Sequence, residues 1–411
     1  MESASILTAK HLLLAVGVIL AVGSLSGIAA RKLNLPDVAL FLLVGIVLGP
    51  ELSGIVDVRA DSAFNQIILI FGSCYILLDG GAGLKLRVIK EVWITITLIS
   101  TVGVLITAAI TGLAASYFLG MSGMTALLLG VSIASTDPAT LIPVFKRLKI
   151  KERVAQTVMS ESAFNDAMGA IVTFAVLGVV LGTEKFNLGS ASAHLVVNAL
   201  VGIAAGAALG YAASLLIAHE KFGFLMEYAP LVTLMAVVGA YLTAETLNAS
   251  GFMAVFVFGI MLGNKETFGF RLERDEQDKL EDFVATTSLI MRMFIFILLG
   301  SQVSFALVGK YLSGGMMLVF VFMFIARPVT VFACALPDRR SKWSLREMIF
   351  MCWTRETGVI PAALAGILLG MKAPGSEIIA SVTFLAILMT ILLQATTTRW
   401  LAGRLGLLED H

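Results

Sequence analysis

Long apolar stretches separated by short polar connections run along the whole chain. A helix needs about 20 apolar residues to cross the roughly 30 Å hydrocarbon core of a bilayer, and most of these stretches reach that length. The pattern predicts thirteen helices, of which the second and the ninth are short. We expect them at residues 11–30, 37–50, 64–83, 92–118, 123–146, 153–182, 193–218, 228–247, 251–264, 284–306, 311–336, 346–371 and 376–401.

Composition supports an all-α polytopic membrane protein embedded in a lipid bilayer. Of the 411 residues, 58% are hydrophobic and 14% are charged, whereas soluble domains contain about 25% charged residues. The net charge of +1 argues against a nucleic-acid-binding protein. Cys74, Cys334 and Cys352 each lie in an apolar stretch without metal-ligand spacing, so we expect buried thiols and no disulfide framework.

The distribution of basic residues predicts the orientation, because Lys and Arg gather in cytoplasmic connections. With the N-terminus outside, the inner connections hold most of the 29 Lys and Arg residues, including a cluster at 146–153. We therefore expect an external N-terminus and a cytoplasmic C-terminus. The charged stretch at 271–283 is expected to be a cytoplasmic linker helix, or otherwise a plain solvated connector.

Thr136, Asp137 and Pro138 interrupt the fifth apolar stretch. A charged residue at the bilayer centre costs about 2.5–3.5 kcal/mol on insertion scales, and proline removes a backbone donor from a helix. A helix broken at this point frees backbone carbonyls, which can bind a cation where they line a cavity. The alternative is a proline kink in which Asp137 caps the second half of the helix.

The sixth apolar stretch carries Glu161, Ser162, Asn165 and Asp166. Residues four apart lie on the same side of a helix, so the two carboxylates, the hydroxyl and the amide share one side. This set predicts a cation-coordinating surface with a titratable group. A polar seam between two helices is the alternative, although such seams are usually built from uncharged residues.

A second polar interruption lies in the twelfth stretch, at Arg355, Glu356, Thr357 and Gly358. If the spans divide into six, one and six, the two interruptions occupy corresponding places. Paired interruptions of this kind point to a transporter site at the interface of inverted repeats. We expect a first repeat at 1–182, a connecting span at 183–220, a second repeat at 221–403 and a short cytoplasmic tail at 404–411.

Three further charged residues lie within apolar stretches. A membrane-embedded arginine keeps its charge and seeks a carboxylate, so Arg327 is predicted to pair with Glu161. Arg292 is expected to pair locally or to reach the cytoplasmic surface. Asp79, at the end of the third stretch, is either an interfacial residue or part of the polar site.

The motif Thr136-Asp137-Pro138, followed by Glu161 to Asp166 (ESAFND), resembles the NhaP-type branch of the monovalent cation:proton antiporters, which includes the animal sodium/proton exchangers. The stretches Leu33–Pro50 and Ser250–Asn264 are also similar to that family. The resemblance therefore covers nearly the whole chain.

The resemblance implies a secondary transporter and not an enzyme. Further implications are a homodimer, crossed discontinuous helices in spans 5 and 12, and elevator-like alternating access. The chain is expected in the cell membrane of a prokaryote. The resemblance also implies that the cation is held by Asp166, Asp137, Ser162, the Thr136 carbonyl and Asp79. In the same way it implies that Asn165, Glu161 and Arg327 organise the site.

The expected activity is exchange of Na⁺ or K⁺ for H⁺ at one carboxylate site, which serves pH homeostasis. Related electrogenic antiporters have a second aspartate where this chain has Asn165, and an amide carries no titratable proton. We therefore expect electroneutral one-for-one exchange, with no cofactor and no nucleotide-binding domain. The alternative is a sodium- or proton-coupled symporter of an organic solute with the same fold.

Overall fold

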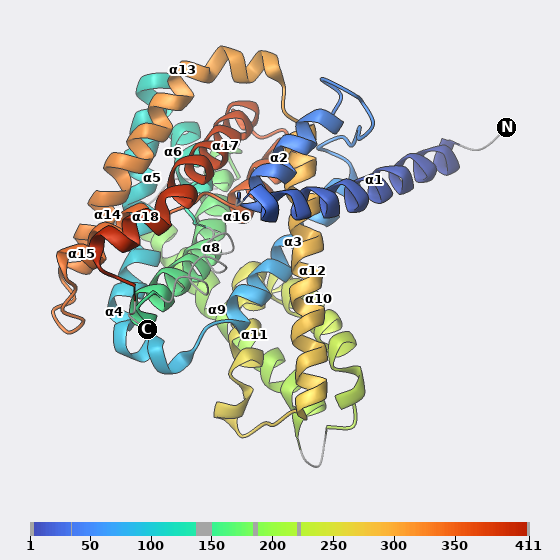
Figure 1. The fold of residues 1–411 in the computed structure, drawn as a ribbon, viewed down its shortest axis with the longest axis vertical. Helices are drawn as coiled ribbons and strands as arrows, with labels where there is room; N and C mark the ends of the chain where they lie inside the picture. The colour runs from blue at the N-terminus through green and yellow to red at the C-terminus, as the bar shows by residue number, and fades with distance from the viewer. Residues whose placement is uncertain (1–3, 34, 137–149, 184–187, 220–222, 409–411) are drawn as a thin grey trace.

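The computed structural model describes residues 4–33, 35–136, 150–183, 188–219 and 223–408 (Figure 1). Apart from one isolated bridge between Ile150 and Leu408, all regular structure in these residues is helical, which confirms the predicted all-α class. The helices of the first half are α1 (Ala4–Leu33), α2 (Asp37–Leu48), α3 (Ala63–Ala82), α4 (Leu86–Ser100), α5 (Val102–Leu119), α6 (Gly123–Ser132), α8 (Glu152–Val180) and α9 (Leu188–Ala218).

The second half contains the remaining helices and two short π-helical turns, η3 and η4. They are η1 (Met226–Tyr228), α10 (Ala229–Thr246), α11 (Gly251–Gly263), η2 (Lys265–Phe268), α12 (Arg274–Ser301), α13 (Phe305–Val321), η3 (Phe322–Ala326), α14 (Arg327–Ala335), α15 (Leu345–Trp353), α16 (Val359–Gly370), α17 (Ser376–Thr390), η4 (Ile391–Ala395) and α18 (Thr396–Leu405).

The helices have the lengths and composition of an integral membrane protein. Within the described residues, nine helical segments are long and apolar enough to cross a bilayer, and four shorter apolar helices accompany them. The short ones are α2, α6, α11 and α16. Each of the thirteen predicted ranges overlaps one of these segments, and the second and ninth are short as expected.

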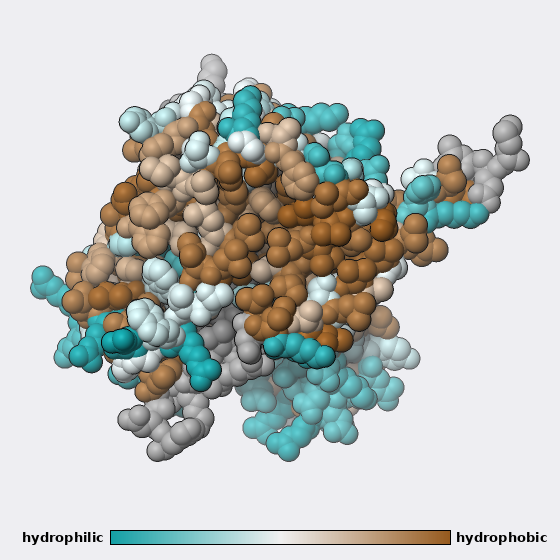
Figure 2. Space-filling view, turned by 45° about the horizontal axis from the view of Figure 1, so that its top comes forward, coloured by the Kyte–Doolittle hydropathy of each residue, from teal (hydrophilic) through white to brown (hydrophobic). Residues whose placement is uncertain are grey.

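The surface agrees with this assignment. Figure 2 shows an apolar surface between polar ends. The N-terminal helix α1 extends away from the other helices in Figure 1. Of an apolar stretch of 18 residues in this helix, 22% is buried. A helix so exposed and so apolar is stable in contact with lipid and not in contact with water.

The charged stretch at 271–283 differs from its prediction as a separate linker helix. Residues from Arg274 onward form the first turns of α12, which continues to Ser301 without a break. Asp275 and Glu276 lie in the first turn, where negative side chains stabilise the positive end of the helix dipole. The polar connector and the tenth apolar stretch are therefore one helix.

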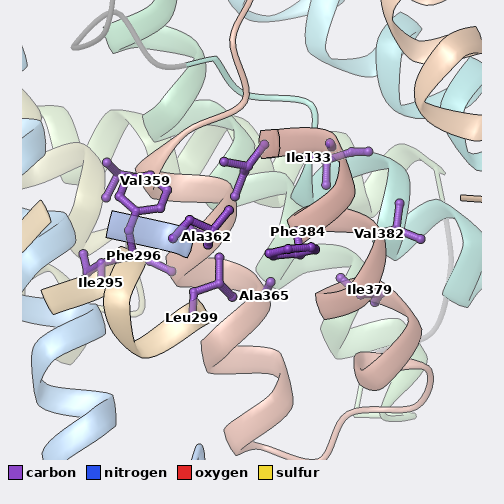
Figure 3. Close-up of a cluster of buried hydrophobic side chains, with 14 of the residues drawn as sticks. Ile133, Ile295, Phe296, Leu299, Val359, Ala362, Ala365, Ile379, Val382 and Phe384 are labelled. Carbon is purple, nitrogen blue, oxygen red and sulfur yellow. The ribbon is translucent and has the colours of Figure 1, made fainter. Parts of the chain in front are cut away.

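Helix α6 ends, and helix α16 begins, inside the main cluster of buried apolar side chains. Ile133, directly after α6, and Val359, at the start of α16, are almost completely buried. Figure 3 shows them near Phe296 of α12 and Phe384 of α17, among other apolar side chains. The backbone at the two interruptions is therefore shielded from water, and its polar groups need partners within the protein.

Several helix pairs pack backbone against backbone through glycine, among them α2 with α12 and α3 with α11. A Cβ atom on Gly300 of α12 would lie 2.3 Å from the Leu42 carbonyl oxygen of α2. A Cβ atom on Gly263 of α11 would lie 2.1 Å from the Ala82 carbonyl oxygen of α3. No larger residue fits at these distances, and close approach through small residues is typical of helices packed in membranes.

A buried aspartate organises the loop between α14 and α15. Asp338 is 4% exposed, and its carboxylate accepts hydrogen bonds from the Thr95 hydroxyl at 2.6 Å and the Ser341 hydroxyl at 2.6 Å. It also accepts from the backbone N–H groups of Thr95, Arg340 and Ser341. Burial alone raises the pKa of Asp338, but the hydrogen bonds outweigh burial and lower it below its ordinary value.

We expect Asp338→Asn to destabilise the protein, because an amide cannot accept all these bonds. The cost is about 1–3 kcal/mol for a buried charged acceptor. A carboxyl group with a lowered pKa stabilises the fold above its unfolded pKa, about 3.9, and loses that contribution as the pH falls through its folded pKa. Thermal unfolding in detergent should show a large difference from the wild type at neutral pH that shrinks in acid.

The exposed Asp57→Asn variant is the matched control and should unfold like the wild type. A difference between Asp338→Asn and the wild type that is independent of pH would contradict the role of the ionised carboxylate.

Candidate functional site

The polar residues predicted on the sixth span lie on α8, which is helical throughout its length. Glu161, Ser162, Asn165 and Asp166 are all buried, with no more than 5% of their surface exposed. They lie on neighbouring positions of one side of the helix. Two carboxyl groups, an amide and a hydroxyl are thus enclosed within the protein, where an ionised group needs a compensating charge or hydrogen bonds.

Hydrogen bonds from Ser162 and Asn165 attach Thr136, in the first interruption, to α8. The Ser162 hydroxyl donates to the Thr136 carbonyl oxygen at 2.6 Å. The Thr136 N–H donates to Asn165 Oδ1 at 3.1 Å, and Asn165 Nδ2 donates to the Thr136 hydroxyl at 3.0 Å. Both backbone polar groups of Thr136 are therefore satisfied by α8, through the residue directly before Asp166 and the residue one turn before it.

Helix α6, which leads into the first interruption, ends before the break that the sequence predicts at Thr136 to Pro138. Helix α6 stops at Ser132, and residues from Ala134 to Thr136 are not helical. A Cβ atom on Gly169 of α8 would lie 3.2 Å from the Ser135 side chain, so the glycine leaves room for the non-helical segment. The chain is therefore non-helical from Ala134 to Thr136, whereas Asp137 and Pro138, where the break was predicted, lie outside the described residues.

The predicted ion pair between Arg327 and Glu161 is present. The Arg327 guanidinium, 2% exposed, binds both carboxylate oxygens of Glu161, with Nη2 at 2.9 Å from Oε2. Its Nε and Nη2 groups also donate to the Met351 carbonyl oxygen at 3.0 and 2.7 Å. One arginine therefore joins α14, α8 and the end of α15.

The second interruption occupies residues 354–358, between α15 and α16, as predicted. Arg355, 3% exposed, donates from Nη2 to the Ala134 carbonyl oxygen in the first interruption. The centre of its guanidinium group lies 4.3 Å from the ring centroid of Phe322, within cation–π range. The two interruptions are thus in direct contact, although 221 residues separate them in the chain.

Other polar groups of the second interruption are also buried. The Thr357 N–H donates to the Thr390 hydroxyl of α17 at 3.1 Å, and the Thr354 hydroxyl donates to the Phe350 carbonyl oxygen at 2.9 Å. Glu356 has no exposed surface. Gly358, the last non-helical residue, directly precedes α16.

Asp79 is not joined to this group. It lies near the C-terminal end of α3 and is partly exposed, and its side chain makes no hydrogen bond or ion pair with a described residue. The neighbouring Gly80 faces α8, since a Cβ atom on it would lie 3.7 Å from that of Ala163. Asp79 is therefore close to the site helix without being part of its hydrogen-bond network.

Several partners in this network could not be found from the sequence. The carbonyl groups of Ala134 and Met351 carry no side-chain signal, and Thr390 resembles any other hydroxyl in an apolar span. The π-helical turns η3 and η4 lie directly before Arg327 and directly after Thr390. Such turns occur frequently at functional sites, but the residues that form them have no distinctive pattern.

The oxygen atoms assembled here suit a small hard cation and a proton. Carbonyl groups in unwound helix segments and buried carboxylates are the groups with which membrane transporters bind Na⁺ and H⁺. Among the described residues, no three His, Cys, Asp or Glu side chains come together in the manner of a metal centre. Among the described residues, Thr136, Ser162 and Asp166 offer a carbonyl, a hydroxyl and a carboxyl group of this kind.

Comparisons with known proteins agree with this arrangement. The family described as sodium/hydrogen exchanger, transmembrane, matches residues 17–404. The Na(+)/H(+) antiporter 1 of Methanocaldococcus jannaschii is 32% identical, over 95% of this chain and 94% of that protein. The K(+)/H(+) antiporter NhaP of Alkalimonas amylolytica is 26% identical, over 95% of this chain and 66% of that protein.

The fold is also similar to that of a solved structure. The sodium proton antiporter MjNhaP1 of Methanocaldococcus jannaschii, determined at pH 8, superposes with a TM-score of 0.83 at 30% sequence identity. The match covers 96% of this chain and 99% of that one. With matches over nearly their whole lengths in sequence and in fold, the chain belongs to the transmembrane sodium/hydrogen exchanger family.

Proposed function

We propose that this protein is a secondary active antiporter that exchanges a monovalent cation, Na⁺ or K⁺, for a proton. The observation that carries the proposal is the position of Asp166, buried on α8 directly after Asn165 and one turn after Ser162. These two residues hold the non-helical Thr136 by both of its backbone polar groups. Relatives named as Na(+)/H(+) and K(+)/H(+) antiporters support the reaction class and leave both cations as candidates.

The proposed architecture has thirteen membrane crossings arranged as six, one and six. Nine long and four short apolar helices within the described residues support this count. The contact of Arg355 with the Ala134 carbonyl supports a pair of discontinuous helices that cross at the site. The excess of Lys and Arg in alternate connections supports an external N-terminus, and we propose a homodimer in a prokaryotic cell membrane, where the exchange serves pH homeostasis.

In the proposed mechanism, one site binds either a cation or a proton and moves mainly when it is occupied. Asp166 carries the proton or contributes its charge to the cation, and Asp137 completes the ligands. The Ser162 hydroxyl and the Thr136 carbonyl, each with lone pairs to spare beyond their mutual hydrogen bond, supply neutral oxygen atoms. Alternating exposure of this site to the two sides gives exchange without a cofactor.

Asn165 sets the stoichiometry in this proposal. Its amide is engaged with Thr136 on both its oxygen and its nitrogen, and an amide has no proton to exchange. One cation therefore replaces one proton, and the exchange moves no net charge across the membrane.

The competing function is a symporter that couples Na⁺ or H⁺ to an organic solute. The two functions differ in what drives proton flux. An antiporter moves protons when salts alone are added to sealed vesicles, whereas a symporter requires its solute.

Asp166→Asn should abolish exchange, because an amide neither binds a proton nor contributes a charge to a cation. The measurement is alkalinisation of acid-loaded proteoliposomes, followed by a pH-sensitive dye after separate additions of Na⁺, K⁺, Li⁺ and NH₄⁺ salts. The wild type and the exposed control Asp57→Asn should respond, and Asp166→Asn should match empty vesicles. Full exchange by a folded Asp166→Asn protein would exclude the proposed site, and no response of the wild type to any salt would favour the symporter.

Arg327→Met should chiefly destabilise the protein, because it leaves the Glu161 carboxylate buried without its partner. Removing one partner of a buried ion pair costs about 3–5 kcal/mol, whereas replacing both is often close to neutral. Thermal unfolding should therefore show a lower Tm for Arg327→Met than for the double variant Arg327→Met/Glu161→Gln. Equal Tm values for the two variants would show that the charge pair is not the source of the loss.

A membrane potential should leave the exchange rate unchanged, because one charge moves in each direction. The measurement uses a diffusion potential set by a permeant anion such as thiocyanate, so that no candidate cation sets the potential, with Na⁺ or K⁺ as the transported cation. Asn165→Asp adds a titratable group to the site and should make the rate depend on the potential. Potential-dependent exchange by the wild type would contradict the one-for-one stoichiometry.

A further inference from the structure

A shallow hollow of about 560 Å³ lies along α18 and is lined by none of the residues of the site on α8. Thr398 and Ala402 of this helix are completely buried on its inner side. The hollow is formed by residues of the opposite side, and its largest side chain, Trp400, is 62% exposed. Its lining consists of Thr396, Arg399, Trp400, Gly403, Arg404 and Leu408.

The exposed side of η4 and α18 changes from apolar to cationic along its length. Leu392 and Leu393 are 43% and 45% exposed. Trp400 follows two turns later, and Arg404 lies one turn beyond it, with its guanidinium carbon 5.7 Å from the centroid of the Trp400 ring. Acyl chains, the membrane interface and the headgroups of a lipid leaflet follow in the same order, and tryptophan prefers the interface.

Three arginines lie on or near this end of α18. Among the described residues, no carboxylate forms an ion pair with Arg399, Arg404 or Arg346. Arg346 lies near the C-terminal end of α18, because its Nη1 atom would be 3.8 Å from a Cβ atom on Gly406, the residue that follows this helix. Guanidinium groups bind phosphate oxygens in paired, charge-assisted hydrogen bonds.

The hollow lies on the basic face of the protein. Leu408, in its lining, pairs with Ile150 two residues before α8, and α8 begins within the basic cluster that the charge distribution assigns to the cytoplasm. The inner leaflet carries anionic lipids, which basic pockets between membrane helices bind by their headgroups.

From these features we propose that the hollow binds the headgroup of an anionic phospholipid. The phosphate lies between Arg399 and Arg404, Trp400 lies at the level of the glycerol, and the acyl chains run along Leu392 and Leu393. This binding is independent of cation exchange, so its test does not rely on transport.

The experiment measures thermal unfolding of the full chain in detergent with added lipid. Phosphatidylglycerol should raise the Tm above its value with phosphatidylcholine, for the wild type and for the control R339Q/R340Q, which removes two exposed arginines outside the hollow. Most of that rise should be lost in R399Q/R404Q. An equal rise in all three proteins would overturn the proposal.

Two further measurements identify the molecule that carries the phosphate and the place where it binds. Glycerol phosphate alone should not reproduce the rise, and if it did, a water-soluble phosphate would be the ligand and the lipid assignment would fail. Brominated phosphatidylglycerol should quench the tryptophan fluorescence of the wild type more than that of Trp400→Phe. Equal fractional quenching of both proteins would place the lipid elsewhere.

Discussion

A helix that breaks inside an apolar protein leaves backbone donors and acceptors without their helical partners, and each of them needs another hydrogen bond. In this protein, side chains from other helices supply those partners. Ser162 and Asn165 satisfy the carbonyl and the N–H of Thr136, and Arg355 satisfies the carbonyl of Ala134. At the second interruption, Thr390 binds the N–H of Thr357. An unsatisfied group would cost several kcal/mol in lipid-like surroundings, so each interruption depends on residues far away in the chain.

Two buried arginines also bind carbonyl groups at or near the ends of these helices. Arg355 lies at the C-terminal end of α6, where the helix dipole is negative and a cation is stabilising. Arg327 combines a carboxylate partner with the free carbonyl of Met351 at the end of α15. Each arginine therefore meets a carbonyl at or just beyond the end of a helix, and Arg327 also compensates the buried charge of Glu161.

The sequence predicted the features that arise from local patterns. Apolar length located the helices, a spacing of four residues located the polar side of α8, and the need of a buried arginine for a carboxylate paired Arg327 with Glu161. The contact between Arg355 and Ala134 could not be predicted, because it depends on how distant segments meet and uses a backbone acceptor. The continuity of α12 through its charged start was also missed, since a polar stretch extends a helix as readily as it ends one. Asp137, which the motif made prominent, lies outside the described residues.

The glycine contacts have a mechanical consequence. Where α2 meets α12 and α3 meets α11, carbonyl oxygens lie where a Cβ atom would clash, so no layer of side chains separates the backbones. Backbone atoms cannot change rotamer, and sliding along such a contact would drive rigid groups into one another. Interfaces made by side chains are softer, such as that between Gly366 of α16 and the Leu69 side chain of α3. Helices therefore slide past one another more easily across such side-chain interfaces, whereas each glycine-packed pair is expected to move as one rigid unit.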